Sequence, residues 1–238
     1  MNIEVLADSG SVAERAASII ADYAREAIAS RGSFVMAVSG GHTPWIMLRR
    51  LAAAQIPWSA VHIVQVDERV APAGHTDRNL THLRESLADS PLPPDQLYAM
   101  PVESPDLEAA AGSYAATLRT IAGELPVIDL VHLGLGPDGH TASLVPGDSV
   151  LEVDNADVAL SGPYQGRRRM TLTYPILNRA RRILWVVTGG EKVDMVNRLI
   201  DGDRGIPAGR VSSDRALLLA DSAAASQHTN KTGGVVCA

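Results

Sequence analysis

The sequence predicts an α/β protein, with a single Rossmann-like domain over residues 1–238 whose mostly parallel sheet carries helices on both faces. Short apolar runs that suit buried strands alternate along the chain with longer stretches in which apolar residues recur at helical spacing. Such alternation produces parallel sheets that are buried on both faces. No low-complexity segment divides the chain, and its hydrophobic content of 46% allows a substantial core.

The first predicted elements are a helix, a strand and a glycine-rich loop. Apolar residues have helical spacing over 11–30, and Ser11 with Glu14 forms a capping-box pair at the start of that stretch. The apolar run "FVMAV" (34–38) predicts a buried strand. This strand leads into "SGGHTP" (39–44), after which a second helix is expected.

Two further elements complete the first half of the chain. The run "VHIVQV" (61–66) predicts a second strand, which ends in the charged triplet "DER" (67–69). Ser104 and Pro105 are typical of the N-cap and first position of a helix, which is expected to reach about Ala122.

The second half of the chain continues the same alternation. Apolar runs predict strands over 127–133, 169–173, 182–188 and 215–221. The segment "GLGPDGH" follows the first of these strands, and "GGEK" with a helix follows the third.

The composition excludes several classes of partner. The formal net charge is −6 and no long basic run occurs, so neither nucleic acid nor an anionic membrane is expected as a partner. Cys237 is the one cysteine, which excludes a disulfide framework within the chain. The start lacks the pattern of a signal peptide, and no apolar run is long enough to span a membrane. We therefore expect a cytoplasmic protein.

Three polar segments follow predicted strands, and this shared position predicts one cleft. They are "SGGHTP", "DER" and "GPDGH". Ligands of open α/β sheets bind beyond the carboxyl ends of the strands, which is where these three segments would meet.

The glycine loop has the features of an anion site. Gly40 and Gly41 allow close approach of the backbone, and Thr43 with Pro44 suits the start of a helix. The N–H groups of Gly40, Gly41, His42 and Thr43 would then face a bound phosphate. An ordinary glycine turn before a capped helix has the same sequence, so this segment alone leaves both interpretations open.

The cations of two other segments also have two interpretations. Arg69 suits bidentate binding of a phosphate, but with Asp67 it could equally belong to a surface salt-bridge cluster. Lys192 of "GGEK" follows two glycines at a helix start after a strand, which suits either a cation at the edge of the sheet or a solvated lysine at a helix end beside Glu191.

The segment "GLGPDG" fits the G-x-G-x-x-G pattern, but we reject a dinucleotide site. Asp138 would place a carboxylate where the pyrophosphate should lie, and Pro146 leaves room for only a stub of helix.

Asp138 and His140 are better interpreted as chemical groups that converge in a turn. A short helix starting near Gly139 would place His140 in its first turn, where the dipole disfavours the imidazolium form. A neutral imidazole at the mouth of a cleft is a ready general base. The alternative is that Asp138 is an N-cap and His140 a solvated turn residue. The remaining histidines lack ligand spacing, so no metal is expected.

An ordered set of segments resembles the 6-phosphogluconolactonase family across roughly residues 35–220. The segments are "SGGHTP", "PWSAVHIVQVDERVAPAGHTDRNL", "GLGPDGHTASLVPG", "RRRMTLTYPILNRARRILWVVTGGEK" and "IPAGRV". The resemblance implies hydrolysis of 6-phospho-D-glucono-1,5-lactone to 6-phospho-D-gluconate, in the oxidative pentose phosphate pathway, without a metal or cofactor.

The resemblance also implies roles for individual residues. His140 would activate water, and Asp138 would orient His140. The glycine loop would hold the phosphate of the sugar-phosphate lactone, with Asp67, Arg69, Arg169 and Lys192 as further substrate-binding residues. A monomer or a small homo-oligomer is expected.

The sequence departs from the family pattern at three places. His42 and Arg78 each stand where a serine is usual, and Val145 replaces a common phenylalanine. None of these positions belongs to the Asp138–Gly139–His140 core, so they bear on substrate affinity more than on the type of reaction.

Two other functions are compatible with this fold. Aminosugar-6-phosphate deaminases and isomerases share the histidine motif but continue with a glutamate, whereas here no carboxylate follows "DGH" until Asp148. A non-catalytic sugar-phosphate sensor usually carries a helix-turn-helix domain, and the sequence ahead of the first glycine loop is too short for one.

Overall fold

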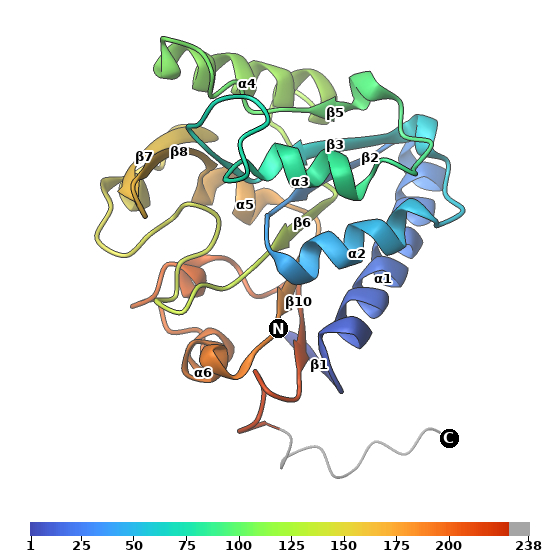
Figure 1. The fold of residues 1–238 in the computed structure, drawn as a ribbon, viewed down its shortest axis with the longest axis vertical. Helices are drawn as coiled ribbons and strands as arrows, with labels where there is room; N and C mark the ends of the chain where they lie inside the picture. The colour runs from blue at the N-terminus through green and yellow to red at the C-terminus, as the bar shows by residue number, and fades with distance from the viewer. Residues whose placement is uncertain (229–238) are drawn as a thin grey trace.

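Residues 1–228, which the computed structural model describes, form two sheets, and the larger sheet has seven parallel strands (Figure 1). Cys237 lies outside these residues. The strand order of the large sheet is β1 (Asn2–Leu6), β10 (Ala216–Asp221), β9 (Ile183–Val187), β6 (Leu130–Leu133), β2 (Phe34–Val38), β3 (Val61–Gln65) and β5 (Leu97–Tyr98). The predicted α/β class is confirmed, and the sheet also includes two edge strands, β1 and β5, that the sequence did not indicate.

Helices cover both faces of the large sheet (Figure 1). One face packs against α1 (Ser9–Arg31), α2 (His42–Ala52) and α3 (Asn79–Ser86). The other face packs against α4 (Leu107–Ala122), α5 (Tyr174–Arg179) and α6 (Val193–Ile200). Single-turn helices are η1 (Trp58–Ala60), η2 (Pro94–Gln96), η3 (Ser149–Glu152), η4 (Gly190–Lys192) and η5 (Ala208–Arg210).

Strand β2 shows why the central strands are continuous apolar runs. Phe34, Met36 and Val38 point into the core under α1 to α3. Val35 and Ala37 point into the core on the opposite face. Because side chains of a strand alternate between faces, a strand with a hydrophobic core on each side has no polar positions to alternate with.

The second sheet is antiparallel and has the strand order β4 (Asp67–Arg69), β8 (Arg167–Leu172) and β7 (Val158–Tyr164). A turn at Gln165 and Gly166, both with positive φ, joins β7 to β8. Such a turn matches the twist of a hairpin. The triplet "DER" follows the strand β3 as expected, and it is itself a short strand that pairs with β8. The predicted strand at 169–173 exists, but in this second sheet.

Two predicted helix caps are wrong, because an aspartate caps each helix instead. The Asp8 carboxylate accepts from the N–H of Ser11 at 2.8 Å, so α1 begins before the expected capping box. The Asp106 carboxylate accepts from the N–H of Ala109 at 3.0 Å, two residues beyond Ser104.

The strand order reverses between β2 and β6, since the chain continues from β2 to β3 on one side and from β6 to β9 on the other. Connections diverge at such a switch point and leave a crevice at the carboxyl ends of the strands. Among residues 1–228, none of the helices is long and apolar enough to cross a membrane.

Candidate active site

Two adjoining cavities lie beyond the carboxyl ends of β2, β6 and β9. The first has a volume of about 180 Å³ and is lined by residues that include Gly40, Asp67, Arg69, Asn79, Gly136, His140, Arg169 and Lys192. The second has a volume of about 440 Å³ and is lined by Gly41, His42 and Thr43, and it shares Gly40 and Lys192 with the first. The three polar segments that the sequence singled out therefore meet at one place.

His140 is paired with Asp138 in the first cavity. The Asp138 Oδ1 atom lies 2.5 Å from His140 Nδ1 and also accepts from the backbone N–H of His140 at 3.2 Å. Partial burial acts to raise the pKa of Asp138, but the hydrogen bonds from His140 and Tyr164 outweigh it and lower that pKa. Asp138 is therefore an ionised acceptor, which requires that Nδ1 of His140 carries the proton.

Two glycines of "GLGPDGH", Gly136 and Gly139, allow the turn that brings Asp138 and His140 together. The His140 ring packs directly over Gly136, where a Cβ atom would collide with it. Gly139 has a φ of +83°, a conformation that other residues adopt only with strain. The N–H of Gly136 donates to the carbonyl of His140 at 2.8 Å, which closes the turn. The G-x-G-x-x-G spacing thus arises from a tight turn that seats a histidine.

The short helix near Gly139 that would have placed His140 in its first turn does not form. Turns and a short bridge between Thr141 and Leu144 follow Gly139, with no helix until η3. His140 therefore gains nothing from a helix dipole, and its charged partner is the Asp138 carboxylate.

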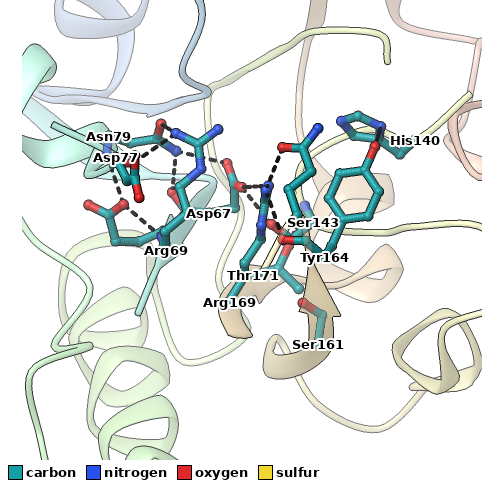
Figure 2. Close-up of polar contacts among 12 residues, drawn as sticks. Asp67, Arg69, Asp77, Asn79, His140, Ser143, Ser161, Tyr164, Arg169 and Thr171 are labelled. Carbon is teal, nitrogen blue, oxygen red and sulfur yellow. Dashed lines mark hydrogen bonds and ion pairs between the residues drawn. The ribbon is translucent and has the colours of Figure 1, made fainter. Parts of the chain in front are cut away.

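Tyr164 is a third member of this group, and the sequence analysis missed it. Its hydroxyl donates to Asp138 Oδ2 at 3.1 Å. Its ring meets the His140 ring edge-on (Figure 2), and the two ring centroids are 5.2 Å apart. Tyr164 ends β7, far from Asp138 in the sequence, so only the tertiary fold brings the two together.

Cations gather on the other side of the cavity. Arg69 and Arg169 are cross-strand neighbours on β4 and β8, so both side chains lie on one face of the small sheet (Figure 2). Asp67 lies on the same face and offsets part of their charge, with its Oδ2 4.0 Å from Nη1 of Arg169. Ser143 Oγ donates to the same Oδ2 at 2.6 Å.

Asn79 orients Arg69, and sequence reasoning missed this role too. Asn79 Oδ1 accepts from Arg69 Nη1 at 2.8 Å, while its amide donates to the carbonyl of Asp67 at 3.0 Å. Asn79 Oδ1 lies so close to Gly40 that a Cβ there would collide with it. Asn79 belongs to the "RNL" triplet that carried part of the family resemblance, which was the available signal.

Beneath Arg69, a buried carboxylate fixes the position of Asn79. Glu68 is completely buried, and it accepts from the backbone N–H groups of Arg69 and Asn79 at 2.8 Å each. Arg78 Nε lies 3.0 Å from Glu68, and its Nη1 bonds Glu103 at 2.7 Å. A buried carboxylate is costly unless it is paired, so Arg78 has a structural reason to differ from the usual serine.

The glycine loop begins helix α2 in a different way from that expected. Gly41 is the N-cap of α2, and no side chain caps the helix there. Thr43 is instead buried, and its hydroxyl bonds the hydroxyl of Thr188 at 2.8 Å. The backbone N–H groups of the first turn have no intrahelical acceptors, as at any helix start. His42 is exposed at the second cavity.

Lys192 ends η4 and lies where the two cavities adjoin. Its ammonium group is 4.0 Å from the largely exposed Glu191, so that ion pair is loose. Within residues 1–228, no three His, Cys, Asp or Glu side chains are grouped as a metal site.

The fold and the site define an α/β protein with a carboxylate-held histidine on one side of a cavity and basic side chains on the other. Comparisons with known proteins identify the family of this α/β protein. The model of the family described as glucosamine-6-phosphate isomerases/6-phosphogluconolactonase matches residues 7–219. A 6-phosphogluconolactonase of Synechocystis sp. is 36% identical over 195 residues, covering 80% of this chain and 81% of that protein. The chain belongs to this family.

Solved structures give the same result for the fold. A structure of 6-phosphogluconolactonase from Trypanosoma brucei superposes with a TM-score of 0.85 at 25% identity, covering 95% of this chain and 98% of that one. A monomeric glucosamine-6-phosphate deaminase superposes nearly as well, with a TM-score of 0.82 at 19% identity, covering 95% and 99%. The fold is therefore shared by both activities and does not distinguish them.

Proposed function

We propose that this chain hydrolyses 6-phospho-D-glucono-1,5-lactone to 6-phospho-D-gluconate, the second step of the oxidative pentose phosphate pathway. One observation carries the proposal: His140, held by Asp138, lines the same cavity as Arg69, Arg169 and Lys192. The relatives named 6-phosphogluconolactonase support it. A cytoplasmic location and a monomeric or small homo-oligomeric state stay predictions from the sequence.

In this proposal, the phosphate binds at the basic side of the cavity. Arg69 and Lys192 supply charge, and the free N–H groups at the start of α2 supply directed donors. Arg169 is buried, and its Nη1 lies 4.0 Å from Asp67 Oδ2. Its positive charge contributes to the electrostatic potential of the cavity. Binding at the phosphate end positions the reacting carbonyl at the opposite side, which converts binding energy into orientation.

His140 is then the general base. Because Asp138 accepts the proton on Nδ1, the lone pair of His140 is on Nε2. Nε2 removes a proton from water as the water oxygen forms a bond to C1 of the lactone. The C1–ring oxygen bond then breaks, and the imidazolium returns its proton to the departing oxygen. Asp138 stabilises the imidazolium between these steps, and the protons balance without a further reactant.

Aminosugar-phosphate deamination is the second candidate because the fold is shared. That chemistry needs another carboxylate after the histidine, and the next one along the chain is Asp148. Its two oxygens accept from the N–H groups of Val150 and Gly162, at 2.9 and 2.8 Å. Asp148 is thus held by backbone groups, which favours the lactonase.

The test compares three substrates with blanks that lack enzyme. Freshly generated 6-phosphogluconolactone is followed by acid release, because this lactone also opens without enzyme. Unphosphorylated glucono-1,5-lactone measures the contribution of the phosphate, and glucosamine 6-phosphate is followed by ammonia release. We expect rapid hydrolysis of the phosphorylated lactone, much slower hydrolysis of the unphosphorylated one, and no ammonia.

Each other result contradicts the proposal in a distinct way. Ammonia release without lactone hydrolysis would identify a deaminase. Binding of sugar phosphates with no turnover of any substrate would identify a sensor.

A further inference from the structure

Tyr164 contacts both members of the pair to which the proposed function assigns catalysis. Its hydroxyl lies 3.1 Å from Asp138 Oδ2 and 3.4 Å from His140 Nδ1. The two rings meet at 63° (Figure 2). Asp138 is ionised and accepts only, so the phenol must be the donor in its contact with Asp138.

We propose that Tyr164 is a positioning residue that holds Asp138 in the orientation that fixes the proton of His140 on Nδ1. This inference rests on the proposed function, because it assigns a role within that reaction. It concerns a residue that no motif of the sequence pointed to.

The hydrogen bonds around Asp138 explain why a third group is needed. Oδ1 accepts from His140 twice, at the ring and at the backbone. Oδ2 has Tyr164 as its donor. A carboxylate on an exposed turn rotates freely unless both oxygens are occupied, and rotation of Asp138 would release the proton of His140 to either ring nitrogen.

Tyr164 itself is held firmly by the hairpin. The guanidinium of Arg169 lies over its ring, 5.0 Å from the centroid. Arg169 also donates to the side chain of Gln165 in the β7–β8 turn at 3.2 Å. Tyr164 therefore joins the basic side of the cavity to the Asp138–His140 pair.

The phenol also changes the charge that His140 experiences. A hydrogen bond to Oδ2 withdraws part of the negative charge of Asp138, so the carboxylate stabilises an imidazolium less strongly. Burial, followed by the bond to Asp138, raises the pKa of Tyr164, which keeps the phenol protonated and able to donate. The other charged groups of the cavity are Asp67, Arg69, Arg169 and Lys192, and the substitutions below leave them all in place.

The decisive variant is Tyr164→Phe, which keeps the ring and removes only the hydroxyl. Tyr98→Phe is a matched control, because the Tyr98 hydroxyl also lies 3.0 Å from a histidine Nδ1, that of His62, outside both cavities of the site. Tyr164→Leu removes the ring as well and separates packing from hydrogen bonding.

The expected results follow from loss of one hydrogen bond to a charged group. For Tyr164→Phe, kcat falls about tenfold with KM nearly unchanged. Imidazole ¹⁵N NMR shows a mixture of His140 tautomers in place of the single Nδ1–H form. Tyr98→Phe matches the wild type in kcat, KM and the His140 tautomer.

Two results would overturn the inference. Tyr164→Phe could keep the wild-type kcat and His140 tautomer, with only Tyr164→Leu impaired, which would assign Tyr164 to packing alone. If the wild type fails to hydrolyse the lactone, the proposed function fails, and the NMR measurement still decides the inference. An unchanged Nδ1–H tautomer in Tyr164→Phe would then refute it.

Discussion

His132 and His140 lie on one segment of the chain, in β6 and in the turn that follows, yet their surroundings are opposite. His132 is completely buried, and among residues 1–228 it has no charged partner and no partner for its Nε2, while its Nδ1 accepts from the N–H of Ser39 at 3.3 Å. His140 is partly exposed and bonded to a carboxylate. The environment, rather than the residue type, therefore makes a histidine suitable for proton transfer.

Burial alone explains the chemistry of His132. It lowers the pKa of His132 to about 3, so this imidazole stays neutral near pH 7. A base that cannot become protonated near neutral pH cannot exchange a proton with substrate. His132 therefore serves only to hold the start of the glycine loop through Ser39.

Substituting each histidine in turn tests this contrast directly, and loss of His140 should reduce activity more than any other change. His140→Ala should lower kcat/KM for 6-phosphogluconolactone by about 10²–10⁴-fold, or about 3–5 kcal/mol, as expected for loss of a general base. His132→Asn keeps an acceptor near the position of Nδ1 and should retain activity close to the wild type. Acid release, corrected for spontaneous opening, measures both. Equal losses in the two variants would contradict the contrast.

The second prediction concerns Asp138, the carboxylate that distinguishes His140 from His132. Asp138→Asn removes the charge and lets the amide donate to Nδ1, which favours the wrong tautomer of His140. We expect a fall in kcat of about 10²-fold, or about 3 kcal/mol, with KM little changed. Asp106→Asn, in which asparagine still caps α4, is the control for an aspartate that serves only the backbone. Full activity of Asp138→Asn would show that His140 needs no partner.

The third prediction concerns stability at acid pH, where His132 is the sensitive residue. Its pKa is about 3 in the folded state and about 6.5 when unfolded, so the unfolded chain binds the extra proton between these values. The free energy of unfolding should therefore fall as the pH drops below about 6.5, by about 1.4 kcal/mol per pH unit at most. At pH 4.5 this amounts to roughly 3 kcal/mol.

The variant His132→Asn isolates this contribution. Every carboxylate titrates equally in the two proteins, so the difference between their unfolding free energies reports His132 alone. Urea unfolding at pH 7 and pH 4.5 should show that the variant loses less stability on acidification than the wild type. Parallel losses would show that His132 is hydrated or paired when folded.

The same contrast separates what the sequence could predict from what it could not. The pairing of Asp138 with His140 was predictable because the two residues are near neighbours in a turn. The meeting of Gly40, Arg69 and His140 was predictable because the carboxyl ends of parallel strands share one edge. These inferences needed only local geometry and the alternation of elements.

Contacts and burial that depend on the tertiary fold could not be predicted from the sequence. Tyr164 reaches Asp138 because it ends β7, at the hairpin that β7 forms with β8. Asn79 reaches Arg69 only because the buried Glu68 holds the start of α3. The burial of His132 was similarly hidden, because a strand within an apolar run can present a polar residue to either the core or a cavity.

The smallest expected effect tests how closely the turn fits His140. Gly136→Ala places a methyl group where the His140 ring now lies, so the ring must shift while Asp138 and the cations stay in place. A displacement of about 1 Å is enough to cost activity, and we expect kcat to fall about tenfold or more, or about 1.4 kcal/mol. Gly190→Ala, whose added Cβ would meet only open space, is the control and should match the wild type. Because Gly136 carries no chemical group, a loss confined to Gly136→Ala would show that the position of the imidazole, in addition to its presence, limits the reaction. An unimpaired Gly136→Ala would mean that the ring is free to find a second productive position, and the tight turn would then serve folding alone.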